Sequence, residues 1–116
     1  MAKRMPEAVY EDVFARAESD AFFVACEVNE RSVCTFVATE WHHRKMRSQG
    51  GAHQVANGLA VCKSCHMYFH AHPAIAYSNG WLVRSHLDPA SVPVKRRDRL
   101  VRLFDDGSFE EVNDAA

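Results

Sequence analysis

The stretch HHRKMRSQGGAHQVANGLAVCKSCHMYFH, residues 42–70, concentrates the residue types that bind metals. It opens with two adjacent histidines, His42 and His43, and continues through a Gly-Gly loop and an asparagine between apolar residues. It closes on a Cys-x-x-Cys-His motif that a second histidine follows four residues later. Each feature alone is a weak signal. Their order and spacing within one short segment predict a fold that is organised around a metal centre.

Four cysteines fall into two pairs, and in a reducing compartment cysteines grouped this way more often hold a metal than form disulfides. Two residues separate Cys62 from Cys65, a spacing that lets both thiolates reach one tetrahedral Zn²⁺. Cys26 and Cys34 can supply the other two ligands, although the polar loop of seven residues between them is wider than in a normal zinc knuckle. We therefore expect a structural zinc on all four thiolates, with four reduced, metal-free cysteines as the alternative.

The histidines predict a second metal site. His66 and His70 stand four residues apart on a predicted helix, so both imidazole rings project from the same face. His42, at the end of a predicted strand, can supply a third ligand. Because adjacent residues of a strand point to opposite faces, His43 is expected to point away from that metal unless the strand ends there, which suits a base that acts on water. The remaining histidines are expected to be ordinary surface or core residues: His53, His72 and His86.

The rest of the sequence predicts one α+β domain over residues 1–116, with its core at 26–83. Apolar residues at helical spacing after Pro6 indicate an N-terminal packing helix, and a Gly-containing turn near the C-terminus indicates a hairpin. β-branched and aromatic residues before His42 and a short apolar run before Cys62 predict two paired strands. The expected elements are a helix over 6–18, strands over 35–41 and 59–62, helices over 63–72 and 73–79, and a hairpin region over 94–112.

Charge is unevenly distributed along a chain whose net charge is −1. No acidic residue lies between Glu40 and Asp88, an interval that holds all seven histidines and several lysines and arginines. A locally positive face on a nearly neutral protein suits a polyanion such as a phosphate backbone, and chance clustering is the alternative.

The sequence predicts neither a membrane span nor a signal peptide. No apolar run approaches the roughly 20 residues that are needed to cross a bilayer. The N-terminus has no apolar stretch behind its positive charges. The chain is therefore expected in the cytoplasm, without contact to a membrane.

The segment from about Cys26 to Trp81 resembles the HNH endonucleases, also called ββα-metal or His-Me finger nucleases. The resemblance is best over the motifs Glu40-Trp41-His42-His43-Arg44-Lys45, Arg47-Ser48-Gln49-Gly50-Gly51, Asn57-Gly58-Leu59 and Cys62-x-x-Cys65-His66-x-x-x-His70. The Arg-Ser-Gln-Gly-Gly loop and the Gly-Trp after the helix are similar to those of small HNH proteins from phages and mobile elements. One departure is Asn29, which stands where family members usually have the second cysteine of the first knuckle.

The resemblance implies a small ββα-metal core, in which a short two-stranded antiparallel sheet precedes a helix and a zinc knuckle lies beside them. His42 matches a metal ligand of the family, and His43 matches its general base. Asn57 matches the residue that orients that base or its loop, and His66 and His70 match the remaining ligands. The implied cofactors are one divalent ion (Mg²⁺, Mn²⁺, Ni²⁺ or Zn²⁺) on the histidines and a structural Zn²⁺ on the cysteines.

The implied activity is hydrolysis of DNA phosphodiester bonds by an endonuclease or nickase, with Arg44, Lys45 and Arg47 as clamps on phosphates. The alternative is a non-catalytic zinc-ribbon module that binds nucleic acid, or its variant with a single zinc on Cys62, Cys65 and two histidines. Phage packaging, restriction, recombination and DNA degradation all employ such modules. Partners besides DNA are therefore expected among nucleic-acid-processing proteins, phage packaging proteins included, and the chain is expected to be a monomer or weak dimer.

Overall fold

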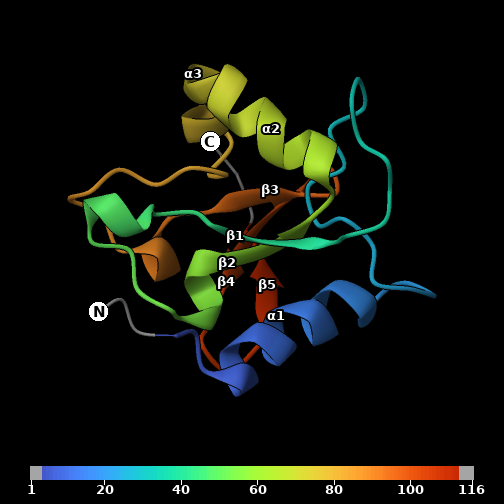
Figure 1. Ribbon diagram of the computed structural model, residues 1–116, viewed down its shortest axis with the longest axis horizontal. Coiled ribbons are helices and arrows are strands. Elements are labelled where there is room, and N and C mark those ends of the chain that lie inside the picture. The colour runs from blue at the N-terminus through green and yellow to red at the C-terminus, as the bar shows by residue number, and fades with distance from the viewer. Residues whose placement is uncertain (1–3, 113–116) are drawn as a thin grey trace.

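The computed structural model describes residues 4–112, so both ends of the predicted domain, 1–3 and 113–116, lie outside the described residues. The helices are α1 (Glu7–Glu18), α2 (Lys63–Ala71) and α3 (Pro73–Ser78) (Figure 1). The strands are β1 (Glu40–His43), β2 (Gly58–Val61), β3 (Val94–Arg96), β4 (Arg99–Leu103) and β5 (Phe109–Glu111). Short 3₁₀ turns lie at Arg47–Gln49, Val55–Asn57 and Pro89–Ser91. Within residues 4–112, no helix is both long enough and apolar enough to cross a membrane.

The centre of the fold is formed by β1, β2 and α2, which follow one another along the chain as the sequence predicted. β1 and β2 pair antiparallel, with His42 opposite Leu59. α2 begins directly after β2, and the Cys62 sulfur caps it by accepting a hydrogen bond from the backbone N–H of Cys65. The predicted α+β class, with a short antiparallel sheet, helices and a C-terminal hairpin, is confirmed.

Two parts of the predicted secondary structure differ from the observed fold. The strand expected over 35–41 begins only at Glu40, because Phe36 adopts a left-handed backbone conformation (φ 74°) that interrupts an extended chain. Before Glu40, the chain instead forms a single bridge between Val37 and Ala25, the residue that precedes Cys26. Near the C-terminus, β4 and β5 form the predicted hairpin, and β3 adds a third strand that was not predicted.

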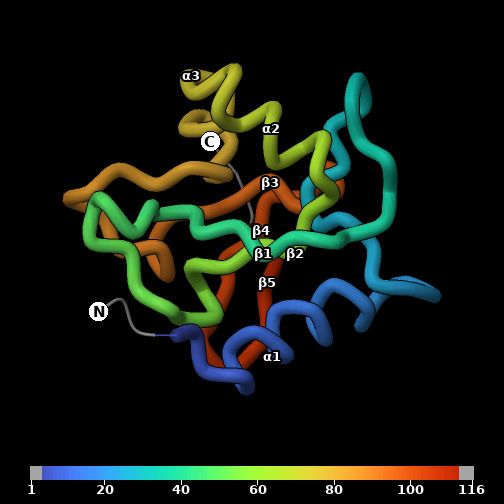
Figure 2. The backbone as a smooth tube through the Cα atoms, viewed as in Figure 1, coloured from blue at the N-terminus to red at the C-terminus, as the bar shows by residue number. Residues whose placement is uncertain are grey.

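Apolar side chains of α2, β2 and the C-terminal sheet share one core with Trp81. Trp81 is buried, and the centroid of its ring lies 5.4 Å from the centroid of the Phe69 ring. Its indole N–H donates to the Lys95 carbonyl at 2.8 Å. A smaller cluster packs Val13 and Ala17 of α1 against β2 and its neighbours. α1 thus lies along one side of the molecule and α2 and α3 along the other, with the strands between them (Figure 2). The N-terminal helix has the packing role that its apolar spacing predicted.

A buried ionic network joins three parts of the fold: α1, the loop between Cys26 and Cys34 (the first cysteine loop), and the C-terminal sheet of β3, β4 and β5. The Glu27 carboxylate is 0 % exposed and accepts hydrogen bonds from Arg16 at 2.8 Å and from Arg96 at 2.7 Å. Arg96 also donates to the Asp20 carboxylate at 2.8 Å. Burial alone would raise the pKa of Glu27, but the two guanidinium groups outweigh it and lower that pKa below its usual range. The polar loop after Cys26 therefore contributes a buried carboxylate to the interior.

Candidate metal and active site

The three histidines that were predicted as metal ligands come together where β1 faces α2. His42 belongs to β1, and His66 and His70 project from successive turns of α2, since residues four apart share one helix face. One ring nitrogen of each lies within 4.8 Å of the others, close enough for a single ion. Three protein ligands leave a further coordination position open for water or substrate, which is the arrangement of catalytic metal sites. These side chains are therefore able to bind a divalent metal.

Hydrogen bonds decide which nitrogen of two of these rings faces the metal. His42 Nε2 lies 2.7 Å from the Trp81 carbonyl oxygen, which can only accept, so Nε2 donates and Nδ1 is left for the ion. His66 Nδ1 lies 2.8 Å from a Glu40 carboxylate oxygen, which in the same way leaves Nε2 for the ion. Burial lowers the pKa of His42 to about 3, so its ring is neutral at pH 7, as a metal ligand must be.

His43, the predicted general base, is the last residue of β1, and it is half-buried. It opens onto the same cleft as the three candidate metal ligands. This cleft has a volume of about 190 Å³ and is lined by Trp41, His42, His43, Met46, Arg47, His66 and His70. Burial lowers the pKa of His43 to about 4, and the neighbouring His53 and Arg47 add to the effect. Its imidazole is therefore neutral at pH 7 and able to accept a proton.

Two residues of this region were not predicted to belong to the site. Glu40 lies two positions before His42 on β1, so both side chains share one face of the strand, and this spacing was the available signal. His53 was expected to be an ordinary histidine, but its Nδ1 lies 3.1 Å from Nε2 of His43. No local pattern indicates this second contact, because the loop between β1 and β2 brings the two rings together.

Asn57 fastens the loop that follows β1. Its side chain is fully buried, and its Oδ1 accepts a hydrogen bond from the Lys45 N–H at 2.7 Å. Its Nδ2 donates to the Lys45 and Ala52 carbonyls at 3.0 and 3.1 Å. Glycine is needed at Gly51 because a side chain there would overlap the Lys45 carbonyl. Of the two predicted tasks of Asn57, the geometry favours holding the loop, and a direct part in catalysis stays a prediction.

The predicted phosphate contact of Arg44 is wrong. Its side chain is 0 % exposed, and its guanidinium donates at 2.7–3.0 Å to the backbone carbonyls of Gly80, Ala56, Pro89 and Val92. Burial lowers the pKa of Arg44 to about 9, still above neutrality, so the guanidinium keeps its charge at pH 7. Arg44 is a structural cation that ties the end of β1 to the segment after α3, and it cannot reach DNA.

The other two basic residues of the predicted clamp are accessible. Arg47 is exposed, lines the cleft, and donates to the Gly51 carbonyl at 2.8 Å. Lys45 is partly exposed, with its ammonium nitrogen 3.2 Å from the Leu87 carbonyl oxygen. Arg47 lies at the cleft and Lys45 lies outside its lining, and both accessible cations stay candidates for contact with DNA.

The four cysteines form a second group. The sulfur atoms of Cys26, Cys34, Cys62 and Cys65 all lie within 4.8 Å of one another, which fits four ligands around one tetrahedral zinc. The wide spacing of the first pair is accommodated because the chain between its members turns at Asn29, whose φ is 57°. Asparagine adopts this left-handed conformation more readily than most residues do. The cysteines and the histidines each form a complete ligand group, so the arrangement does not favour one zinc shared between them.

Hydrogen bonds prepare this cluster for a metal, which binds thiolates rather than thiols. The backbone N–H groups of Thr35 and Cys65 donate to the Cys62 sulfur at 3.4 and 3.3 Å. A hydrogen bond from Cys65 outweighs burial and lowers the pKa of Cys26 to about 5. Part of the cluster is therefore ionised at neutral pH before any metal arrives.

Replacing Cys62 with serine is expected to release about one zinc per chain and to destabilise the protein. The free energy of unfolding should fall by about 3 kcal/mol, which is the stabilisation that a bound ligand gives when it is present at roughly 100 times its Kd. Metal analysis after dialysis and urea unfolding measure the two effects. Lys63→Ser, an exposed neighbour, is the matched control. Absence of zinc from the parent protein, purified without chelators, would contradict a zinc site.

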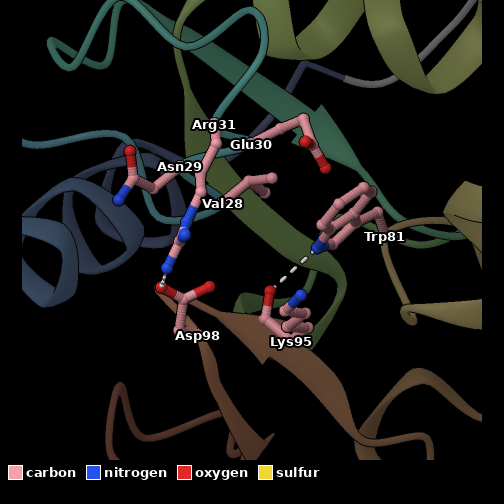
Figure 3. A pocket seen from close by; sticks show the side chains of 7 residues that line it. All are labelled: Val28, Asn29, Glu30, Arg31, Trp81, Lys95 and Asp98. Atoms are coloured by element: carbon pink, nitrogen blue, oxygen red, sulfur yellow. Dashed lines mark hydrogen bonds and ion pairs between the residues drawn. The ribbon is translucent and has the colours of Figure 1, made fainter.

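A further hollow of about 200 Å³ lies between the first cysteine loop and β3 (Figure 3). Its wall includes Trp81, whose indole N–H donates to the Lys95 carbonyl, and an exposed ion pair in which Arg31 lies 3.6 Å from Asp98. Because both charge signs line it, no class of charged ligand is favoured. One lining residue of the hollow, Trp81, also contacts the histidine site, because its carbonyl orients His42.

Comparison with known proteins agrees with this geometry. The family model described as HNH endonuclease matches residues 26–71, which contain all four cysteines, the β1 histidines, Asn57 and the two α2 histidines. Comparisons with curated proteins and with solved structures found no match. Residues 26–71 of the chain thus match the HNH endonuclease family.

Proposed function

We propose that the protein is a metal-dependent DNA endonuclease or nickase that hydrolyses phosphodiester bonds. The observation that carries the proposal is that His42, His66 and His70 meet His43 at one cleft. Three of these histidines can hold an ion, and the fourth is left beside them. A module that only binds nucleic acid has no use for a neutral, half-buried histidine next to a metal-binding group.

Groups in and around the cleft would have separate roles in the reaction. His43 would remove a proton from the attacking water. Glu40 and the Trp81 carbonyl would keep the metal-binding rings in orientation. Lys45 and Arg47 would contact phosphates next to the scissile one, which makes affinity for DNA depend on salt.

A divalent ion held by His42, His66 and His70 would supply positive charge to a phosphate oxygen and to the leaving 3′ oxygen. Imidazole ligands are softer than carboxylates, so Mn²⁺, Ni²⁺ and Zn²⁺ suit the site at least as well as Mg²⁺. The cysteine cluster would hold a separate structural zinc and take no part in the chemistry.

The second candidate function is a zinc-ribbon module that binds nucleic acid without cutting it, and the cysteine cluster favours it as much as the first. Both candidates bind nucleic acid, and cleavage alone separates them. A role in phage packaging or in another nucleic-acid-processing system, and a monomeric or weakly dimeric state, stay predictions.

Incubation of supercoiled plasmid with the protein and Mg²⁺, Mn²⁺ or Ni²⁺ tests the proposal. We expect nicked circles to accumulate with at least one metal and not in EDTA. The matched control is His66→Ala, which removes one metal-binding ring and should abolish nicking while DNA binding, measured by mobility shift, persists. A parent protein that binds DNA tightly but stays inert with every metal would favour the zinc-ribbon module instead.

A further inference from the structure

We infer that His53 is a positioning residue that orients His43 for proton abstraction from water, an inference that rests on the proposed function. His53 Nδ1 lies 3.1 Å from His43 Nε2, and the two ring centroids are 5.3 Å apart. The Trp41 ring is a second neighbour of His43, with centroids 4.6 Å apart. Both rings limit how the His43 imidazole can turn, and only His53 offers it a hydrogen bond through a ring nitrogen.

The direction of this hydrogen bond matters for a base. A neutral imidazole donates from one nitrogen and accepts at the other. If His43 Nε2 donates to His53 Nδ1, then His43 Nδ1 carries the free electron pair that can take a proton from water. The reverse direction would place the His43 proton on Nδ1 and block that atom. A His53 ring that carries its proton on Nε2 can only accept at Nδ1. It would then keep the proton of His43 on Nε2, as a carboxylate or carbonyl does for other catalytic histidines.

The backbone on both sides of His53 is held in place. On one side, the Asn57 amide donates to the Ala52 carbonyl at 3.1 Å. On the other side, the Gln54 amide donates to an Asp105 carboxylate oxygen at 3.2 Å. Asn57 therefore supports the base in two steps, because it holds the residue before His53, and His53 contacts the base. This connection gives the buried asparagine a second task besides its hydrogen bonds with Lys45.

Two substitutions at His53 separate positioning from a merely structural role. His53→Ala removes the hydrogen-bond partner and is expected to slow single-turnover plasmid nicking by about 10- to 100-fold at saturating metal, with the Kd for DNA unchanged. His53→Asn places an amide oxygen near the position of Nδ1 and is expected to restore most of the rate. The matched control is His72→Ala, an exposed histidine between α2 and α3, which should cleave like the parent.

A spectroscopic readout tests the same inference without cleavage. In full-length protein that carries ¹⁵N-labelled histidine, with Mg²⁺ present, the side-chain nitrogen shifts of His43 report which nitrogen is protonated. We expect the Nε2–H form in the parent and in His53→Asn. In His53→Ala we expect a mixture of both forms.

Three results would overturn the inference: parental cleavage by His53→Ala, unchanged nitrogen shifts of His43 in that variant, or a rate loss that His53→Asn does not restore. Failure of the proposed function looks different, because the parent protein itself would then fail to cut DNA with any of the metals tested. In that case the nitrogen shifts still decide whether His53 sets the protonated nitrogen of His43.

Discussion

Replacing His43 with alanine is expected to slow DNA cleavage by about 10²–10⁴-fold, the usual contribution of a general base. The three metal-binding histidines stay in place, so metal content and affinity for DNA should match those of the parent. Single-turnover nicking of supercoiled plasmid, with the metal that serves the parent best, measures the effect.

Two further measurements make this prediction specific to a missing base. His86→Ala removes an exposed histidine and should leave the nicking rate unchanged. Imidazole added to the buffer should accelerate His43→Ala more than the parent, because a small base can enter the open cleft. A His43→Ala protein that cuts as fast as the parent would show that another group takes the proton.

Replacing Glu27 with glutamine is expected to lower the free energy of unfolding by about 3–5 kcal/mol, the cost of removing one partner from a buried ion pair. Both Arg16 and Arg96 contact this carboxylate, and their side chains are 0 % and 3 % exposed. A neutral amide at this position leaves the two buried guanidinium groups without the negative charge of the carboxylate with which both of them pair. Urea unfolding followed by circular dichroism measures the change.

Glu11→Gln is the matched control, since it removes an exposed carboxylate from α1 and should change stability by no more than about 0.5 kcal/mol. Zinc content must be measured in both variants, because Glu27 follows Cys26 directly and loss of metal would also destabilise the chain. A zinc-loaded Glu27→Gln protein as stable as the control would refute a stabilising role of the network.

The two candidate ligand groups could be predicted in part, because two members of each group have local geometry. Cys62 and Cys65 share one turn, and His66 and His70 share one helix face, whatever the rest of the chain does. His42 joins them because β1 pairs with the strand that leads into α2. Spacing along the chain anticipated the pairs Cys62–Cys65 and His66–His70, whereas the ββα arrangement was implied by the resemblance to the HNH endonucleases.

Arg44, Glu27 and His53 could not be predicted in this way. An arginine in a positive stretch is normally solvent-exposed, and burial of Arg44 is possible only because it has acceptors as far away as Val92. Glu27 belongs to a segment of polar composition, yet its partners come from α1 and β3. The contact of His53 likewise depends on the path of a loop. Tertiary contacts decide all three positions, and no local pattern encodes them.

The segment that matches the HNH family contains only part of its own supports. Trp81 orients His42, and Arg16 and Arg96 neutralise Glu27, so the partners lie before and after the matched residues. The matched segment is thus not a self-sufficient module. If it were grafted alone into another scaffold, Glu27 would lack the guanidinium groups of Arg16 and Arg96. During synthesis it also cannot reach its final geometry until β3 has left the ribosome. A nascent chain can therefore contain all the motif residues before the geometry of the site has formed.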